Sequence, residues 1–298
     1  MPGDLPDASL PVFIVSGASR VDPARIAELV AGAFAYARKP LVHVAQSSSQ
    51  AVTLARDAAA VADVVVAVGG DGTVADVATG IFGSAASLGI VPTGSTNITA
   101  RCLDIPRGAR RAVELIAGPH ARRPIDVGRC GERCFLHIAG AGFDAELFGA
   151  TSPTLKRSMG WVAYLPAAAT AIRLPPSRVQ VVADDDVIDA TSPLVLVANG
   201  GSILVPELTL YPEVAIDDGW LDVLVFTAAT MAEIAATLGR MGRLALDRSP
   251  HVQWRRAKAV TIEASPALRV QLDGDVRGET PTTFRIVPGG MTVITPQR

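Results

Sequence analysis

Cysteine is scarce in this chain of 298 residues. Its 3 cysteines form no even set with the spacing of a disulfide scaffold, which is typical of proteins in a reducing compartment. Cys130, Cys134 and His137 lie close together in sequence, but a structural zinc site needs four ligands and no fourth follows nearby. The net charge of -2 excludes a globally basic protein that coats nucleic acid. We therefore expect no disulfide, no structural zinc and no nucleic-acid partner.

Long apolar runs and a signal peptide are also missing. The longest uncharged apolar stretch, near Trp161–Ile172, contains Pro166 and is too short to span a bilayer. The first residues lack the basic and apolar regions of a secretory signal. These absences predict a cytoplasmic protein.

Two common nucleotide-binding motifs are absent too. No Gly-x-x-x-x-Gly-Lys-Ser/Thr pattern occurs, which excludes a P-loop hydrolase. Gly140–Ala145 fits the Gly-x-Gly-x-x-Ala fingerprint of dinucleotide sites, but the acidic residue expected about twenty positions later is missing. We therefore reject both types of site.

The chain does contain a strand that ends in glycines. Val64–Val68 is apolar throughout and rich in β-branched residues, the pattern of a strand buried on both faces of a parallel sheet. Gly69–Thr73 follows, and its glycines let a bulky anion approach the backbone N–H groups. Thr73 is expected to cap a helix at about Val74–Phe82, whose N-terminus adds a partial positive charge. The stretch predicts a phosphate-binding loop.

Asp71 lies inside this predicted phosphate loop, where a bare carboxylate would repel the ligand. A cation resolves the conflict, because Mg²⁺ is commonly held by one or two carboxylates together with nucleotide phosphates. Asp71 would then contact Mg²⁺ directly or through water. The alternative is an ordinary Asp-Gly turn, which does not explain three glycines in front of a capped helix.

Strands and helices alternate over the first part of the chain, which predicts a doubly wound α/β domain. Asp22 and Pro23 are a typical start for a helix that runs to about Arg38. Asn97 either caps the helix after the fourth strand or meets a nucleotide. The predicted strands are Val12–Val15, Leu41–Ala45, Val64–Val68 and Leu88–Val91, and the second helix is Ser49–Ala60.

Short strands separated by turns follow from about Ile125, which predicts a mostly antiparallel β-sandwich domain. Thr230 and Glu233 have capping-box spacing and begin a structural helix at Met231–Leu246. Thr154–Leu174 combines basic residues with helical apolar spacing, and it is either the lip of a lipid cleft or a packed helix. The predicted strands are Ile125–Arg129, Cys134–Ile138, Arg178–Ala183, Val187–Ala190, Leu194–Ala198, Trp220–Phe226, Val260–Glu263, Leu268–Leu272, Thr283–Val287 and Met291–Thr295.

Five segments resemble the diacylglycerol kinase and sphingosine kinase superfamily, over nearly the whole chain and in the right order. Gly69–Thr73 resembles its Gly-Gly-Asp-Gly-Thr motif, which NAD kinases share. Pro92–Asn97 resembles the second nucleotide loop of the lipid kinases. The remaining segments are Gly140–Ala145, Pro212–Asp222 and Asp273–Asp275.

The resemblance implies a lipid kinase that transfers the γ-phosphate of ATP to a lipid hydroxyl, with diacylglycerol as the first candidate and phosphatidic acid as the product. Asp71, Asp217 and Asp218 are the candidate Mg²⁺ ligands that it implies. The candidate nucleotide-binding residues are Gly17, Ser19, Arg20, Gly69, Gly70, Asp71, Gly72, Thr73, Gly94, Ser95, Thr96 and Asn97.

The acidic segments of the resemblance imply the catalytic groups. Asp218, or its neighbour Asp217, would accept the proton of the lipid hydroxyl. Asp275 and Asp71 are the other catalytic candidates, although the family has a longer glutamate where this chain has Asp275. The alternative for Asp218 is a turn residue in front of the strand Trp220–Phe226.

Two other functions remain open. An NAD kinase should carry an Asn-Asp or Asn-Glu segment, which Val197–Gly200 does not supply. A weak or inactive lipid-binding homologue is favoured by departures from the family pattern. Ser16–Arg20 lacks the usual Asn-Pro, Ile98 replaces Asp, and Asp275 replaces Glu.

The expected organisation follows from these assignments. An α/β nucleotide-binding domain should span residues 1–122, a β-sandwich lipid domain residues 123–285, and a strand at 286–298 should return to the first domain. A lipid substrate implies peripheral contact with the inner face of the membrane. The sequence does not identify the lipid and leaves open whether the chain forms a homodimer.

Overall fold

The computed structural model describes residues 10–34, 40–142, 177–201, 214–228, 230–241 and 245–297. The chain divides into two compact units. Unit 1 comprises Met1–Ile125 and Gly289–Arg298, and unit 2 comprises Asp126–Pro288. The long strand β16, Thr282–Thr295, therefore contributes its first part to unit 2 and its last part to unit 1.

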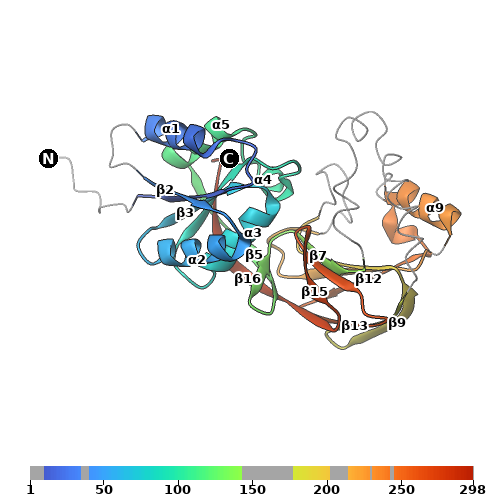
Figure 1. The fold of residues 1–298 in the computed structure, drawn as a ribbon. Coiled ribbons are helices and arrows are strands. Elements are labelled where there is room, and N and C mark those ends of the chain that lie inside the picture. Colours follow the sequence, from blue (N-terminus) through green and yellow to red (C-terminus); the bar gives the residue numbers. More distant parts are fainter. Residues whose placement is uncertain are drawn as a thin grey trace. The chain divides into compact units, whose positions relative to one another are not determined.

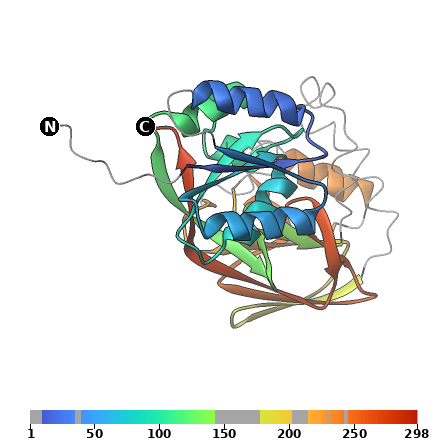
Figure 2. The same ribbon diagram turned by 60° about the vertical axis from the view of Figure 1, so that its left-hand side comes forward.

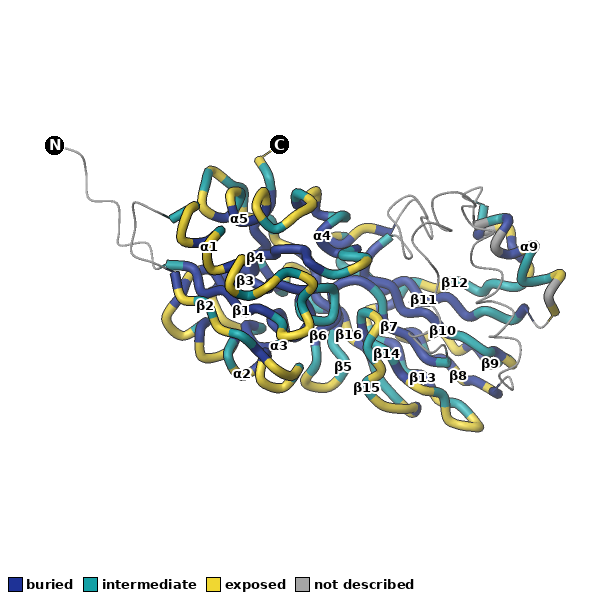
Figure 3. Tube along the Cα trace, turned by 45° about the horizontal axis from the view of Figure 1, so that its top comes forward, coloured by how far each residue is buried: buried dark blue, intermediate teal, exposed yellow. Residues whose placement is uncertain are grey.

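Unit 1 is built on a parallel sheet with strand order β2-β1-β3-β4, and the end of β16 lies beside β4. Every residue of β3 and β4 is buried, as Figure 3 shows, because helices cover both faces of the sheet. This burial explains the unbroken apolar sequence of β3. The strands are β1, Val12–Ser16; β2, Leu41–Ala45; β3, Val64–Gly69; and β4, Ser87–Pro92.

Helices α1 and α5 cover one face of this sheet, and α2 and α3 cover the other (Figures 1 and 2). The carboxylate of Asp22 caps α1 by accepting the N–H of Ala24, as the sequence predicted. The helix ends at Ala33 instead of Arg38, because Phe34 leaves helical geometry and packs its ring edge-on against Phe13. The helices are α1, Pro23–Ala33; α2, Ser48–Ala59; α3, Asp71–Ile81; α4, Ile98–Cys102; and α5, Ala109–Ala117.

The prediction that Thr73 caps α3 was wrong. The helix begins three residues earlier, with Gly70 at the N-cap position and the N–H of Val74 donating to the carbonyl of Gly70. The side chain of Thr73 lies in the first turn instead, against the backbone of Gly69. A glycine without a Cβ atom is what allows this contact.

Unit 2 is a β-sandwich, which confirms the predicted fold class. One layer has the strand order β16-β13-β8-β9, and the other has the order β12-β11-β10-β7-β14-β15. Buried apolar side chains from both layers form one core, in which the rings of Phe135 and Phe284 meet edge-on at 5.9 Å. The strands are β5, Ala121–Cys130, which begins in unit 1 and enters unit 2 at Asp126; β6, Arg133–Phe135; β7, Ile138–Ala141; β8, Ser177–Ala183; β9, Asp186–Ser192; β10, Leu194–Ala198; β11, Leu221–Phe226; β12, Val252–Ala257; β13, Ala259–Ser265; β14, Arg269–Leu272; and β15, Asp275–Glu279.

Three predicted elements of unit 2 differ from the structure. Cys134–Ile138 is not one strand, because the N–H groups of Leu136 and His137 donate to the side chain of Asp273 and the chain changes sheets there. The two strands predicted near the end are one strand, β16. The capping box of Thr230 is present, but α9, Met231–Met241, ends before Leu246, which begins a short 3-10 helix, Leu246–Arg248.

Candidate active site

Two glycine loops meet at one edge of the unit 1 sheet. The first, Gly69–Thr73, leaves β3, and the second, Gly94–Asn97, leaves the neighbouring parallel strand β4. A Cβ atom on Gly94 would lie 2.5 Å from the Cα atom of Gly70. The two backbones therefore touch at a point where no side chain fits.

The second glycine loop is closed by its own asparagine. Asn97 has a left-handed backbone, with φ of 49°, and its side chain accepts the N–H of Gly94 and donates to the carbonyl of Gly94, both at 2.9 Å. Asn97 stands at the N-cap position of α4, but its side chain does not cap that helix. Ser95 is exposed and Thr96 half-buried in the same loop. Asn97 thus fixes the shape of the loop.

Asp71 caps α4, although it is the first residue of α3. Its carboxylate accepts the N–H of Thr99 at 3.2 Å, and the N–H groups of Asn97 and Ile98 also favour its charged form. Burial outweighs these hydrogen bonds and raises the pKa of the Asp71 carboxyl. The carboxylate therefore fastens the first glycine loop to the helix that follows the second.

The N-terminus of α3 has backbone N–H groups without a partner among the described residues. No described side chain caps this helix, and the N–H groups of Gly72 and Thr73 have no partner among the described residues. Such N–H groups, together with the helix dipole, favour an anion. The two glycine loops and this helix end form a compact anion-binding geometry.

The turn after β1 supplies one side chain to this edge. The hydroxyl of Ser19 donates to that of Thr93, at the end of β4, at 2.9 Å. The N–H of Gly17, which we expected to face a nucleotide, donates instead to the carbonyl of Ala45 in β2. Arg20 is exposed and has no partner in the described part of the chain. Ser19 is therefore the residue of this turn that lies against the second loop.

In unit 2, Asp218 holds a turn at residues 215–220, which we call the acidic turn. Its Oδ1 atom accepts the N–H of Trp220 at 3.0 Å, and its Oδ2 atom accepts the N–H of Ala215 at 3.1 Å. The guanidinium of Arg256 also pairs with Oδ2, at 2.5 Å. Asp217 is exposed beside it. The contacts of Asp218 are those of a turn residue, and its assignment as the base stays a prediction.

Three residues around the acidic turn, Asp126, Asp222 and Arg256, were not identified as site residues from the sequence. Asp126 accepts the N–H of Gly219, and Asp222 accepts the Nε of Arg256 at 3.1 Å and the indole N–H of Trp254 at 2.7 Å. Each of these contacts joins two elements that are distant in sequence, so no local pattern points to them. Asp222 is the last residue of Pro212–Asp222, the acidic segment that resembles the family, and this resemblance was the one signal in the sequence that pointed to it.

Asp273–Asp275 forms a tight turn between β14 and β15, as predicted. The carboxylate of Asp273 accepts three successive N–H groups, from Leu136 at 2.7 Å, His137 at 2.9 Å and Ile138 at 3.0 Å. Asp275 pairs through Oδ2 with Arg277 at 2.9 Å, and its side chain is 48% exposed. Its Oδ1 atom has no partner among the described residues. Asp273 is therefore a structural residue and Asp275 an accessible carboxylate.

Replacing Asp273 with alanine should lower the free energy of unfolding by about 3 kcal/mol, because three N–H groups, two of them on buried residues, lose one charged acceptor. Asp275→Ala is the matched control, with an expected change within about 0.5 kcal/mol. Chemical denaturation of both variants measures the difference. Equal stability of the two variants would show that the Asp273 contacts contribute nothing.

The buried carboxyl of Asp222 should make stability depend on pH. Burial raises its pKa above the ordinary value of 3.8. The folded state then binds more protons than the unfolded state, so ionising Asp222 lowers the free energy of unfolding as the pH rises through the folded pKa. Relative to Asp222→Asn, the wild-type protein should lose stability from pH 3.8 upward in urea titrations. A stability difference that does not change with pH would contradict this.

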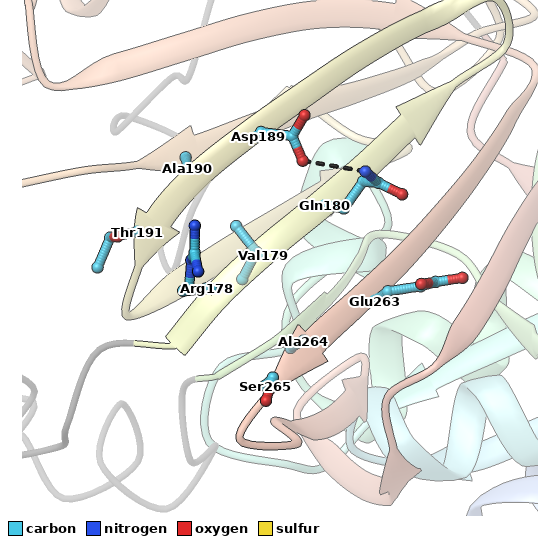
Figure 4. A pocket seen from close by; sticks show the side chains of 9 residues that line it. All are labelled: Arg178, Val179, Gln180, Asp189, Ala190, Thr191, Glu263, Ala264 and Ser265. Carbon is cyan, nitrogen blue, oxygen red and sulfur yellow. Dashed lines mark hydrogen bonds between the residues drawn. The ribbon is translucent and has the colours of Figure 1, made fainter.

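A cavity of about 770 Å³ lies on unit 2 over β8, β9 and β13 (Figure 4). Its lining includes charged side chains of both signs, among them Arg178 and Glu263, and a hydrogen bond of 3.0 Å from Gln180 to Asp189. It contains none of the predicted site residues. The predicted segments Phe143–Ala145 and Thr154–Leu174 lie outside the described residues.

The described residues thus define a two-domain protein with a parallel α/β unit that carries two glycine loops and a β-sandwich that carries an acidic turn. Residues 15–130 match the diacylglycerol kinase catalytic domain, and residues 137–295 match the YegS C-terminal NAD kinase beta sandwich-like domain. The chain belongs to the diacylglycerol kinase family and is a kinase, as the sequence predicted. Membership of a kinase family implies the use of ATP.

Similar proteins cover most of the chain. A diacylglycerol kinase of Bacillus subtilis is 31% identical over 253 residues, which are 80% of this chain and 82% of that protein. A diacylglycerol kinase of Staphylococcus saprophyticus is 27% identical over 237 residues, 78% of this chain and 77% of that protein. The crystal structure of a diacylglycerol kinase from Bacillus anthracis has a TM-score of 0.73 at 20% identity and covers 98% of both chains. This last likeness concerns the fold alone.

Proposed function

We propose that this kinase transfers the γ-phosphate of ATP to the hydroxyl of a lipid, most directly diacylglycerol, and forms phosphatidic acid. The observation that carries the proposal is the contact between the two glycine loops, where Gly70 and Gly94 pack too closely for any side chain beside the uncapped N-terminus of α3. Family membership and the names of the relatives support the lipid acceptor.

ATP would lie over both glycine loops, with its phosphates at the N-terminus of α3. The N–H groups of Gly72 and Thr73 would bind phosphate oxygens, and Ser19 and Arg20 would lie at the margin of the site. Mg²⁺ bound with the nucleotide offsets phosphate charge. The donor set at Asp71 fits an indirect role, because backbone N–H groups of α4 already occupy its carboxylate. Asp71 would therefore meet the hydrated cation through water.

The lipid hydroxyl needs a base, and the candidates in unit 2 differ in their surroundings. A base needs an open oxygen lone pair to accept the proton. The Oδ1 atom of Asp275 has no partner within the described part of the protein, whereas three of the four lone pairs of the Asp218 carboxylate accept hydrogen bonds. We therefore propose Asp275 as the first candidate and keep Asp218 and Asp217 as the alternatives.

The lipid acceptor implies work at a membrane surface. No helix within the described ranges is long and apolar enough to cross a bilayer. We propose a peripheral contact with the inner face of the membrane, for which the basic segment Thr154–Leu174 was the sequence evidence.

The rate should rise several-fold when diacylglycerol is presented in anionic instead of neutral vesicles, because basic side chains are attracted to anionic head groups. Added salt should remove the advantage by screening. Initial rates on both vesicle types across a salt series measure the effect. Equal rates on the two carriers at low salt would exclude an electrostatic contact.

An acceptor panel tests the proposed function. Purified protein with Mg²⁺-ATP is offered diacylglycerol, monoacylglycerol, a sphingoid base and NAD in parallel, and the products are identified by mass. We expect phosphatidic acid to form fastest and no NADP to form. NADP as the main product would support an NAD kinase, and no product with any acceptor would support the inactive homologue.

A further inference from the structure

The acidic turn is closed by protein groups alone. The carboxylate of Asp218 accepts the N–H groups of Ala215 and Trp220, at the two ends of the turn. Asp126 holds the middle, because its carboxylate accepts the N–H of Gly219 and its own N–H donates to the carbonyl of Ile216 at 2.8 Å. The turn thus has its hydrogen bonds before any ion is added.

A guanidinium group already lies beside the carboxylate of this turn. Arg256 pairs with Asp218 through one terminal nitrogen at 2.5 Å and with Asp222 through Nε at 3.1 Å. The side chain of Asp222 is 0% exposed and that of Asp218 18% exposed, so water screens these pairs little. Asp222 and Arg256 are direct neighbours on the paired strands β11 and β12, which fixes the guanidinium in place.

We propose that Arg256 is the built-in cation of the acidic turn and occupies the position at which the sequence indicated Mg²⁺ at Asp217 and Asp218. The carboxylate of Asp218 has three of its lone pairs occupied, by the N–H groups of Ala215 and Trp220 and by the guanidinium of Arg256. The positive charge of this guanidinium also repels a second cation. Among the described residues, no three carboxylate, imidazole or thiol groups converge on one point. The acidic turn therefore keeps its shape without metal, and any Mg²⁺ enters with the nucleotide.

The inference is tested on protein without ATP or lipid, so its outcome does not depend on the acceptor proposed above. Wild-type protein is treated with EDTA, dialysed, and melted with and without millimolar Mg²⁺. We expect the melting temperature to stay within about 1 °C, because an ion that does not bind the folded state cannot stabilise it. A fall with EDTA that Mg²⁺ restores would overturn the proposal.

Arg256→Gln provides the second test, with Arg255→Gln as its matched control. Arg255 is the next residue of β12 and pairs with Asp186 at 3.3 Å, where both side chains are largely exposed. Arg256→Gln should lower the melting temperature by about 5–15 °C, because it leaves the buried carboxylate of Asp222 without a cationic partner. Millimolar Mg²⁺ should raise the melting temperature of Arg256→Gln part of the way back to that of the wild type. It should leave the melting temperature of Arg255→Gln unchanged.

Either of two results with these variants would overturn the proposal. The first is a wild-type melting temperature for Arg256→Gln, and the second is a destabilised Arg256→Gln that Mg²⁺ does not affect. If Arg256→Gln does not fold, Arg256→Lys replaces it, because an ammonium keeps the charge but cannot fork to both carboxylates. We expect Arg256→Lys to melt below wild type and to remain insensitive to Mg²⁺. A Mg²⁺-dependent Arg256→Lys would contradict the assignment.

Discussion

Replacing Gly94 with alanine should lower the rate of lipid phosphorylation by about 100-fold or more. The new Cβ atom would lie 2.5 Å from the Cα atom of Gly70 and 2.9 Å from the side-chain oxygen of Asn97. Both neighbours are held, Gly70 by the start of α3 and Asn97 by its two hydrogen bonds to Gly94, so the loops must separate. A displacement of about 1 Å at a substrate-positioning group costs on the order of 100-fold in rate.

Gly32→Ala is the matched control for this change. Gly32 lies in α1 with no described atom within 4 Å of an added Cβ, so alanine there should stabilise the helix by about 1 kcal/mol and leave the rate alone. ATP affinity and initial rates are measured for both variants, together with their melting temperatures. A folded Gly94→Ala protein with wild-type ATP affinity would show that the contact between the loops is not the nucleotide site.

Asp275→Asn should lower the turnover number by about 10² to 10⁴-fold while the melting temperature stays unchanged. The substitution removes a base without changing volume, and an effect of this size is typical of a lost general base. It corresponds to about 3–5 kcal/mol of transition-state stabilisation. The side chain is 48% exposed and forms one ion pair, with Arg277, so folding should tolerate the change.

Asp218→Asn distinguishes the two candidate bases. It removes the partner of Arg256 and one turn acceptor, so we expect a lower melting temperature and, below that temperature, a smaller loss of turnover than in Asp275→Asn. Turnover numbers at saturating lipid are compared well below both melting temperatures. A large loss in Asp218→Asn with a near-normal rate in Asp275→Asn would return the role of base to Asp218.

The stretch from β3 into α3 shows what local sequence predicts well. An unbroken apolar run rich in β-branched residues specifies a strand buried on both faces, and the glycines after it specify a loop at the carboxyl edge of a parallel sheet. The same reasoning located β4 and the second glycine loop. Capping residues placed the starts of α1 and α9, at Asp22 and Thr230.

The partners of the acidic residues could not be predicted in this way. Asp71 caps α4, which lies 28 positions further along the chain, and Asp273 accepts the N–H of Leu136 across 137 positions. Such contacts follow from how strands and loops pack, which no local pattern encodes. Arg256 was missed because β12 carries two arginines in succession and does not alternate apolar and polar residues as a predicted strand should.

The central claim, transfer of the γ-phosphate of ATP to a lipid alcohol, is tested most directly by following the phosphate itself. The protein is given diacylglycerol and ATP that carries a heavy oxygen isotope in its γ-phosphate, and the products are analysed by mass spectrometry. The account predicts the heavy isotope in the phosphate of phosphatidic acid, with the ester oxygen still that of the unlabelled lipid. Heavy isotope found only in inorganic phosphate, with no labelled phosphatidic acid, would contradict it.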